Sequence, residues 1–500
     1  MDTRVELKAP VRLNDFVRSN KLELSLKSYL ELVMSNNTDI QIQMLSLETP
    51  KNAIMRALAT WDPTATASFS STRSKSPAVT ALDGANTSES LSQPANFSVT
   101  QVLPTGGQYS VGFAAAKSST NSSYALLNPN LNAGLTLNFS QPLLRNRGYY
   151  VNHLNLMVAR SRYRQADYNL RSTLLQLVEQ AESAYWDVIQ ARENLHVAES
   201  AQALADATLK LSQRELELGA LSPLDIFNPE QQLATATLGV SQARFSLAQT
   251  ENALRKQIGA DLDPAIRELP IVLTETVDLP VGVEVNTEKE VEVALQSRPD
   301  LKAAIQSLDL DDLGLRSAQN EALPNLSFNA SYQTRGIGGI VNPYTDPIPG
   351  GLGDALSQMF GFGYPSYTVG VNLQFPIRSH AVAADMADAR SQKKRDALTV
   401  RNTQQQVRLS ILNAVNNLES SKKSLELAKA ASDFAAKYLD AENQKYTLGI
   451  DQMQFVLQAQ NTLTQAQSSV VQAQVGLRRN LLNLYTQTGE LLDQRGIVVQ

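Results

Sequence analysis

The residue types that most often carry chemistry are few and scattered in this sequence. Its 500 residues include no cysteine, and the three histidines, His153, His196 and His380, show neither metal-ligand nor catalytic-triad spacing. The glycine-rich stretch 336–339 is expected in a loop after a strand, whereas a phosphate-binding loop precedes a helix. We therefore predict no catalytic residue, no metal site and no cofactor, and we predict that the protein is not an enzyme.

The amino-acid composition excludes further classes of protein. Hydrophobic residues make up 43% of the chain and charged residues 19%, which is compatible with a packed fold. The net charge of -5 and the lack of a basic stripe argue against a nucleic-acid partner. No run of about 18 apolar residues occurs, so no transmembrane helix is predicted. The segment 1–15 also lacks the apolar core of a secretory signal, which a protein of the cell envelope is expected to have unless its sequence is trimmed.

The elements that would position any functional residue are duplicated in the sequence. The dipeptides Leu218-Gly219 and Leu448-Gly449 are 230 residues apart (449 − 219 = 230), and other identities keep this offset. They include Ala184 with Ala414, Leu233 with Leu463, and Gly259 with Gly489. An earlier block repeats at an offset of 261 (300 − 39 = 261), where Asp39 matches Asp300 and Pro63 matches Pro324. Each half is therefore predicted to contain a helix, a strand region, a long helix, a turn and a second helix.

The predicted helices are long. The segment 152–218 contains neither proline nor glycine and consists mostly of residues that favour helices. At ~1.5 Å per residue it would extend roughly 100 Å. This length is typical of a coiled or barrel-like bundle, although the helix pattern alone leaves an ordinary coiled coil equally open.

The strand segments favour a membrane barrel. In 325–333 and 368–375, apolar residues alternate with Ser, Asn, Gln, Thr and Gly, which places the two sets on opposite faces of a strand. Alternating runs in the first half are predicted at about 64–72, 95–103, 107–116 and 133–141. The helical hairpins are too polar to cover the apolar faces, so lipid outside and water inside is the arrangement that fits both. Trp61, Tyr149 and Tyr150 are expected either at one membrane interface or packed at a helix end.

Two segments stand at the predicted hairpin turns, LELGALSPLDIFNPEQQLATA (216–236) and YTLGIDQMQFVLQAQNTLTQA (446–466). Two others stand where strands give way to helices, LNFSQPLLRNRG (137–148) and LQFPI (373–377). Taken together, these four segments resemble the two hairpin turns and the two strand-to-helix transitions of the outer-membrane efflux protein family, the TolC-like exit ducts. The resemblance implies an α+β membrane protein in which a duplicated strand-plus-long-helical-hairpin unit forms a trimeric transmembrane β-barrel, continued by a periplasmic α-barrel.

The predicted organisation follows the repeat. Residues 1–262 are the first repeat, with an N-terminal helix, barrel strands at about 63–141 and a helical hairpin at about 149–258 whose tip is 218–223. Residues 263–290 form a linker or equatorial segment. Residues 291–500 are the second repeat, with strands at about 325–376 and a hairpin at about 380–488 whose tip is 448–452. The family usually supplies four strands per chain, whereas six are predicted here. Either the barrel is larger, or the hairpin at 95–116 lies outside it.

The resemblance implies two functions for the hairpin tips, namely docking of a periplasmic adaptor protein and closure of the duct. The residues matching the docking positions are Leu218, Gly219, Ala220, Leu221, Ser222, Leu448, Gly449 and Ile450. Both glycines are expected to have a positive φ, because the chain reverses there. The alternative is that these residues only form the turn.

Five residues stand at positions of the family's periplasmic gate, and two of them keep the family's residue type. Tyr446 matches a tyrosine of the latch and Asp225 its aspartate partner, while Asp451 replaces the latch arginine. Phe455 and Gln458 stand where the family often has two rings of aspartate. A ring of Phe455 would form a hydrophobic constriction, which can close a pore by excluding water. Packing of Phe455 within its own chain is the alternative.

The resemblance also implies the partners and the location. We predict a homotrimer in the lipid of the outer membrane, with its helical part in the periplasm, working with an adaptor (membrane fusion) protein and an inner-membrane pump. Its function would be passive export of small molecules or peptides in a tripartite efflux or type I secretion system. The alternative is a soluble coiled-coil scaffold, which has no need for several alternating strands.

Overall fold

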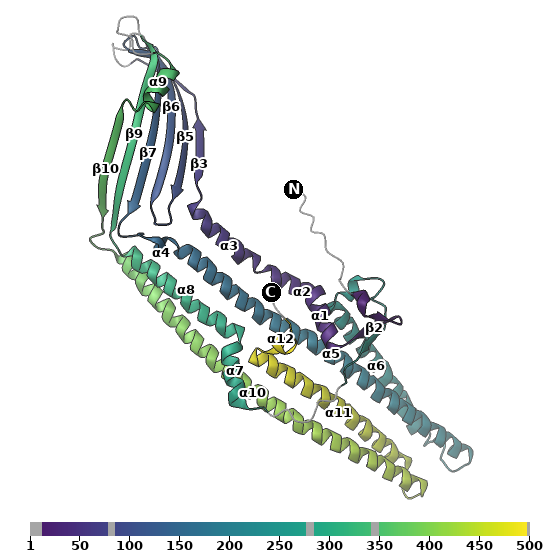
Figure 1. Cartoon of the computed structure of the whole chain (residues 1–500). Coiled ribbons are helices and arrows are strands. Elements are labelled where there is room, and N and C mark those ends of the chain that lie inside the picture. The colour runs from purple at the N-terminus through teal and green to yellow at the C-terminus, as the bar shows by residue number, and fades with distance from the viewer. Residues whose placement is uncertain (1–12, 79–85, 277–284, 342–349, 498–500) are drawn as a thin grey trace. The chain divides into compact units, whose positions relative to one another are not determined.

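The computed structural model describes residues 13–78, 86–276, 285–341 and 350–497. The chain forms two compact units (Figure 1). One unit comprises residues 1–47, 165–305 and 398–500, and the other comprises residues 48–164 and 306–397. No helix in the described ranges is long and apolar enough to cross a membrane.

The first unit is mainly helical. Its helices are α1 (Leu26–Asn36), α2 (Thr38–Leu45), α6 (Phe227–Gln257), α7 (Thr287–Ser297), α11 (Met453–Thr488), α12 (Leu491–Gln494) and most of α5 (Leu154–Glu217) and α10 (His380–Thr447). A small sheet joins β1 (Val17–Arg18), β2 (Lys21–Leu24) and β8 (Ile271–Leu273). The side chain of Asn37 caps α2 by accepting hydrogen bonds from the backbone N–H groups of Asp39 and Ile40.

Two buried tyrosines join the long helix α5 to the short elements of this unit. The hydroxyl of Tyr29 on α1 donates to the carbonyl oxygen of Ala181 at 3.0 Å, and the hydroxyl of Tyr185 donates to that of Leu24 at 3.1 Å. The two ring centroids are 5.4 Å apart. Each ring thus fills the core while its polar atom is satisfied, which is the usual condition for a buried tyrosine.

The second unit contains the main sheet. Its strands are β3 (Thr64–Phe69), β4 (Thr72–Pro77), β5 (Thr87–Val102), β6 (Gln108–Thr120), β7 (Leu127–Pro142), β9 (Asn325–Val341) and β10 (Pro365–Gln374). The order is β10-β9-β7-β6-β5-β3, and β4 pairs with β5 beyond the end of β3. Every pairing in this sheet is antiparallel. The helices α3 (Glu48–Leu58), α4 (Tyr149–Asn152), α9 (Leu352–Phe360) and most of α8 (Pro299–Glu321) complete the unit.

The structure corrects several predicted strand boundaries. The run at 64–72 is interrupted after Phe69, so that two short strands, β3 and β4, pair with different parts of β5. Strand β5 begins at Thr87 rather than 95, and β7 begins at Leu127 rather than 133. The added residues are rich in Ser, Asn and Gln, and the alternation of apolar and polar residues is weak there. Continued hydrogen bonding to the neighbouring strand extends the strands through these polar segments.

The glycine-rich stretch 336–339 lies in strand β9 and not in a loop, so that prediction was wrong. Helix α9 packs directly on this part of the strand. A Cβ atom on Gly336 would stand 1.8 Å from the carbonyl oxygen of Ala355, and one on Gly338 would stand 2.2 Å from that of Gly351. The hydroxyl of Thr334 donates to the carbonyl oxygen of Met359 at 3.1 Å. The glycines therefore allow a helix to approach the backbone of the sheet.

Candidate functional site

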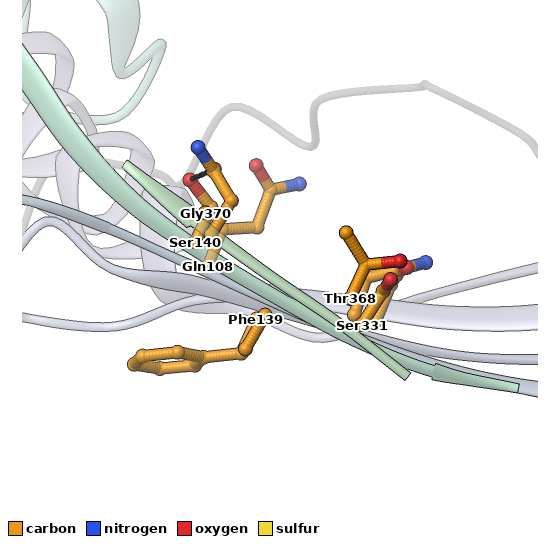
Figure 2. A pocket seen from close by; sticks show the side chains of 10 residues that line it. Gln108, Phe139, Ser140, Ser331, Thr368 and Gly370 are labelled. Carbon is orange, nitrogen blue, oxygen red and sulfur yellow. Dashed lines mark hydrogen bonds between the residues drawn. The ribbon is translucent and has the colours of Figure 1, made fainter. Parts of the chain in front are cut away.

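The main sheet has one apolar and one polar face. Figure 2 shows Phe139 pointing to one side, while Gln108, Ser140, Ser331 and Thr368 point to the other. The polar face is hollowed by a shallow pocket, lined by Gln108, Ser110, Asn138, Ser140, Asn329, Ser331, Thr368 and Gly370 together with Phe139 and Ala330. Hydrogen bonds between strands cross this face, for example from the hydroxyl of Ser140 to the amide oxygen of Asn329 at 2.8 Å. The polar face carries no charge in this region and suits contact with water.

The apolar face is exposed in the single chain. Large apolar side chains on it include Phe69, Phe97, Val111, Leu137, Tyr367, Val369, Val371 and Leu373, and Tyr367 is 78% exposed. Strand β10 has ten residues, which is the length that a tilted strand needs to cross a bilayer. Beyond Phe69, the strands carry charged side chains. There the carboxylate of Glu89 forms ion pairs with Arg73 at 3.1 Å and with Lys75 at 2.6 Å. The apolar face is therefore a band of limited height, as a bilayer requires.

Three aromatic rings form a stack in the second unit. The ring of His153 is stacked on Trp61 at a centroid distance of 4.3 Å and on Tyr149 at 3.5 Å. Nearby, Arg316 donates to the hydroxyl of Tyr150 at 2.7 Å. Trp61 precedes β3 and Tyr149 follows β7, so these residues do lie at one level of the sheet. The rings pack on one another, as the second alternative expected, and Tyr149 stays exposed. A position at the membrane interface stays a prediction.

The tips of the two helical hairpins have the same backbone geometry. Gly219 and Gly449 have φ values of +75° and +70°. After α5, the N–H groups of Gly219 and Ala220 donate to the carbonyl oxygens of Leu216 and Glu215 at 3.0 and 2.8 Å. After α10, the corresponding bonds run from Gly449 to Tyr446 at 2.9 Å and from Ile450 to Lys445 at 3.0 Å. Each tip is a Schellman motif with glycine in the left-handed position, which confirms the predicted positive φ.

Apolar residues at both tips are exposed to solvent. Leu448 is 73% exposed, and Leu218 and Ile450 are exposed to a similar extent. Ala220 and Ser222 are exposed as well, while Leu221 is half-buried. A Cβ atom added at either glycine would meet no other atom within 4 Å. The positive φ, and not a lack of space, is therefore what favours glycine at these two positions. These small apolar protrusions are available to a partner.

The predicted gate residues do not all meet. The hydroxyl of Tyr446 donates to the carboxylate of Glu215 on α5, and not to Asp225, which is exposed. The predicted pairing of Tyr446 with Asp225 is therefore wrong within one chain. The reason is positional, because Tyr446 and Glu215 both lie in the last turn of a long helix, whereas Asp225 follows the first tip. Burial, and then the Glu215 carboxylate, raise the pKa of the Tyr446 phenol above its usual range.

Phe455 lies outside the local hydrophobic core. That core contains Leu439, Met453, Val456, Leu457 and Ala459, with Tyr446 packed against it. Phe455 is 41% exposed, and Gln458 is exposed too. The carboxylate of Asp451 accepts a hydrogen bond from the N–H group of Gln452 at 3.0 Å. Phe455 thus does not belong to the core of its own chain, and its ring is available to another surface.

Buried polar side chains beside the tips were not foreseen from the sequence. Gln460 donates from its Nε2 to the hydroxyl of Thr208 at 2.7 Å, and Glu442, which is buried, pairs with Lys445 at 2.6 Å. The Oε2 of Glu442, the Oε1 of Gln460 and the Oγ of Ser212 have no hydrogen-bond partner among the described residues. The tip region is therefore held by a partly satisfied polar seam.

Comparisons with known proteins agree with this architecture. The family model described as "Outer membrane efflux protein" matches residues 291–490. The chain is 24% identical over 370 residues to the outer membrane protein TolC of Vibrio cholerae, covering 73% of this chain and 78% of that protein. It is 22% identical over 335 residues to the probable efflux pump outer membrane protein TtgC of Pseudomonas putida, covering 65% of this chain and 63% of the relative.

Solved structures show the same fold. A crystal structure of CusC matches with a TM-score of 0.67 and 15% identity, over 97% of this chain and 98% of that chain. The outer membrane channel CmeC of Campylobacter jejuni matches with a TM-score of 0.63 and 15% identity, over 98% and 90% of the two chains. With its two-faced sheet, its paired helical hairpins and these relatives, the chain is similar to the outer membrane efflux protein family, whose model matches residues 291–490.

Proposed function

We propose that this chain is an outer-membrane exit duct, which passively carries small molecules or peptides outward in a tripartite efflux or type I secretion system. The observation that carries the proposal is the two-faced sheet of the second unit. Its exposed apolar band fits lipid, and its uncharged polar face fits a water-filled lumen. A passive duct needs a wall and a gate and no catalytic residue.

The duct would be a homotrimer. One chain has a sheet with two unpaired edges, at β10 and at β3–β4. Lipid does not tolerate open edges, so each copy needs neighbours to complete a barrel. The two helical hairpins of each chain would then form a periplasmic α-barrel with those of the other copies.

The hairpin tips would dock a periplasmic adaptor protein, which links the duct to an inner-membrane pump. Leu218, Leu448 and Ile450 are exposed apolar side chains on tightly capped turns, and such anchors suit a small protein interface. The adaptor would contact both tips, because the two turns have the same backbone geometry.

Closure of the duct would rest on a neutral, apolar ring. Three copies of Phe455 would meet near the periplasmic end, with Gln458 adding no charge. Its exposure in the single chain supports this assignment, because a residue of the local core could not reach the pore. The hydrogen bond from Tyr446 to Glu215 would hold the two long helices of each chain together beside this ring.

A soluble coiled-coil scaffold is the competing function, and the exposed apolar face of the sheet speaks against it. Two measurements separate the alternatives. We expect the purified chain to require detergent for solubility and to produce ion-conducting channels in planar lipid bilayers. A chain that remains monodisperse without detergent and never conducts would overturn the proposed function.

A further inference from the structure

The first half of the chain contains a strand hairpin that the second half lacks. In the second half, β9 pairs directly with β10. In the first half, β3 and β7 are the equivalents of β9 and β10, since Pro63 directly before β3 matches Pro324 directly before β9 at the offset of 261 (324 − 63 = 261) and the segment 137–141 resembles 373–377. These strands are not neighbours, because β5 and β6 lie between them. The second half has helix α9 between its two strands instead.

The inserted hairpin is part of the wall and does not lie beside it. β5 pairs with β3, β4 and β6, and β6 pairs with β5 and β7, over nearly their whole lengths. Residues paired in one row across an antiparallel sheet share a face. One row is apolar at all six strand positions and runs through Ala65, Val99, Val111, Leu137, Tyr332 and Tyr367. A neighbouring row is polar throughout and runs through Thr64, Thr100, Ser110, Asn138, Ser331 and Thr368.

The two edges of the sheet are suited to each other. The sheet is six strands wide and wholly antiparallel, so its two outer strands run in opposite directions. The edge of β10 has ten residues, and β3 and β4 together offer twelve (6 + 6 = 12) at the other edge. A second copy placed beside the first would therefore continue the same antiparallel pattern, without a parallel pair and without a change of face.

We propose that β10 of one copy pairs with β3–β4 of the next, and that three copies close a barrel of about eighteen strands. This inference rests on the proposed trimer and deepens it. Four strands per chain would give a barrel of about twelve strands, whereas the inserted hairpin adds two strands per copy. Barrel diameter grows roughly linearly with strand number, so the wall would be about 1.5-fold wider. Barrels of 16–18 strands leave an aqueous channel, and the polar rows would line it.

Engineered disulfides test which edges meet. The chain contains no cysteine, so no native thiol can form a disulfide with the introduced cysteines. Thr368→Cys on β10 is combined in turn with Thr64→Cys, Thr66→Cys or Ser68→Cys on β3, which samples the unknown register between copies. We expect at least one pair to give covalent dimers and trimers on non-reducing gels after mild oxidation. Thr368→Cys alone is the matched control and should give none.

A second set of variants represents the twelve-stranded alternative. If the inserted hairpin lay outside the wall, β3 would pair directly with β7, and Thr64→Cys would cross-link to Asn138→Cys within one chain, which a loss of free thiols without a dimer band reports. In the six-stranded sheet these two positions are separated by β5 and β6, so no bond forms between them. A bond in this set would overturn the wider barrel and leave the trimer intact. A monomeric mass with no cross-link in either set would overturn both the inference and the proposed trimer.

Direct imaging of the detergent-solubilised trimer decides the matter if no pair forms a disulfide. A count of eighteen strands in the wall supports the inference, and a count of twelve overturns it. Each variant should match the parent in trimer yield under reducing conditions, which shows that the substitutions have not altered folding.

Discussion

At the scale of single residues, a buried ion pair holds the C-terminal segment onto the long helix α5. The carboxylate of Glu182 is 1% exposed and accepts two hydrogen bonds from Arg495, at 2.8 Å from Nε and 2.5 Å from Nη2. Arg478 lies 5.0 Å from the centroid of the neighbouring Trp186 ring. A buried carboxylate needs such a partner, because burial of an unpaired charge is costly.

We expect Arg495→Ala to destabilise the folded chain by about 3–5 kcal/mol, since it leaves the Glu182 charge buried and unpaired. Chemical unfolding in detergent, followed by circular dichroism, measures the loss. Arg267→Ala is the control, because Arg267 forms an exposed pair with Glu268 and its loss should cost at most about 1 kcal/mol. Equal losses of stability in the two variants would show that the buried pair contributes no more to stability than an exposed pair.

The tip glycines allow a test of adaptor docking. Gly219→Val and Gly449→Val place a β-branched residue at a positive φ, at a cost of about 1 kcal/mol or more, and should distort the tips. We expect export by the assembled system to fall while the trimer persists. Gly219→Asn should retain more activity, because asparagine tolerates this conformation. Gly239→Val on α6 is the matched control, since no atom lies near its Cβ position and its φ is not positive. Unchanged export in both tip variants would rule out the tips as the docking surface.

The gate is tested at Phe455. Phe455→Asp should wet the constriction, raise single-channel conductance in planar bilayers and create block by divalent or trivalent cations on the periplasmic side. Phe455→Leu keeps the ring apolar and should behave like the parent. A parent channel that such cations already block, or an unchanged conductance in Phe455→Asp, would place Phe455 away from the pore.

The residue scale also shows the limits of the sequence. The positive φ of Gly219 and Gly449 was predictable, because glycine in a short turn between two helices has a local physical reason. The partner of Tyr446 was not, because it depends on how two helices separated by more than 200 residues are aligned, and neither Glu215 nor Asp225 differs locally in a way that decides it. The Glu182–Arg495 pair could not be predicted for the same reason, because its two residues are far apart in the sequence.

At the scale of elements, the helices and strands with strong periodicity were predicted well and the irregular ones were not. The long helices α5 and α10 follow from segments without helix breakers. Helix α9 was missed, although its apolar residues Leu352, Ala355, Leu356, Met359 and Phe360 have helical spacing. The broken edge strand β3–β4 could not be predicted, because the interruption at 70–71 depends on pairing with β5.

The helices α8 and α10 contain an acidic contact that should make stability depend on pH. Burial, and then Asp396 on α10, raise the pKa of Asp311 on α8 to about 6, with Asp312 adding to the rise and Lys393 opposing it. A raised pKa in the folded state means that ionisation destabilises it. The penalty is therefore full above about pH 6 and disappears as the pH falls toward the usual carboxyl range.

Asp311→Asn should remove this penalty. We expect its melting temperature to exceed that of the parent at pH 7.5 and the difference to shrink at pH 4.5, as measured by scanning calorimetry in detergent. Asp388→Asn, an exposed position on α10, is the control and should show no such pH-dependent gain. A difference that stays constant across this range would mean that Asp311 is not the titrating group.

At the scale of the whole molecule, the fold class was predicted from the alternation of the strands and the duplication together with the resemblance of four segments to a known family. They did not decide how many strands join the wall, because sequence periodicity does not reveal which strands are neighbours. The placement of β5 and β6 between β3 and β7 answers that question for one chain.

Assembly is the main prediction at this scale. Mass measurement in mild detergent should return three chains, because the edges at β10 and β3–β4 require partners in lipid. Val371→Pro in β10 should reduce trimer formation, since proline removes a backbone N–H at that edge strand. Val371→Ala, which shortens the same side chain but keeps the N–H group, is the matched control. A stable monomer with a closed barrel would contradict the predicted assembly.

The inserted hairpin of β5 and β6 also bears on how such ducts diversify. A hairpin begins and ends at the same side of the membrane, so its gain or loss leaves the entry and exit points of the flanking strands unchanged. A single added strand would instead force every later segment to the opposite side. A lineage can therefore alter the bore of its duct in steps of one hairpin, by a single local duplication, while the remainder of the gene evolves under its old constraints.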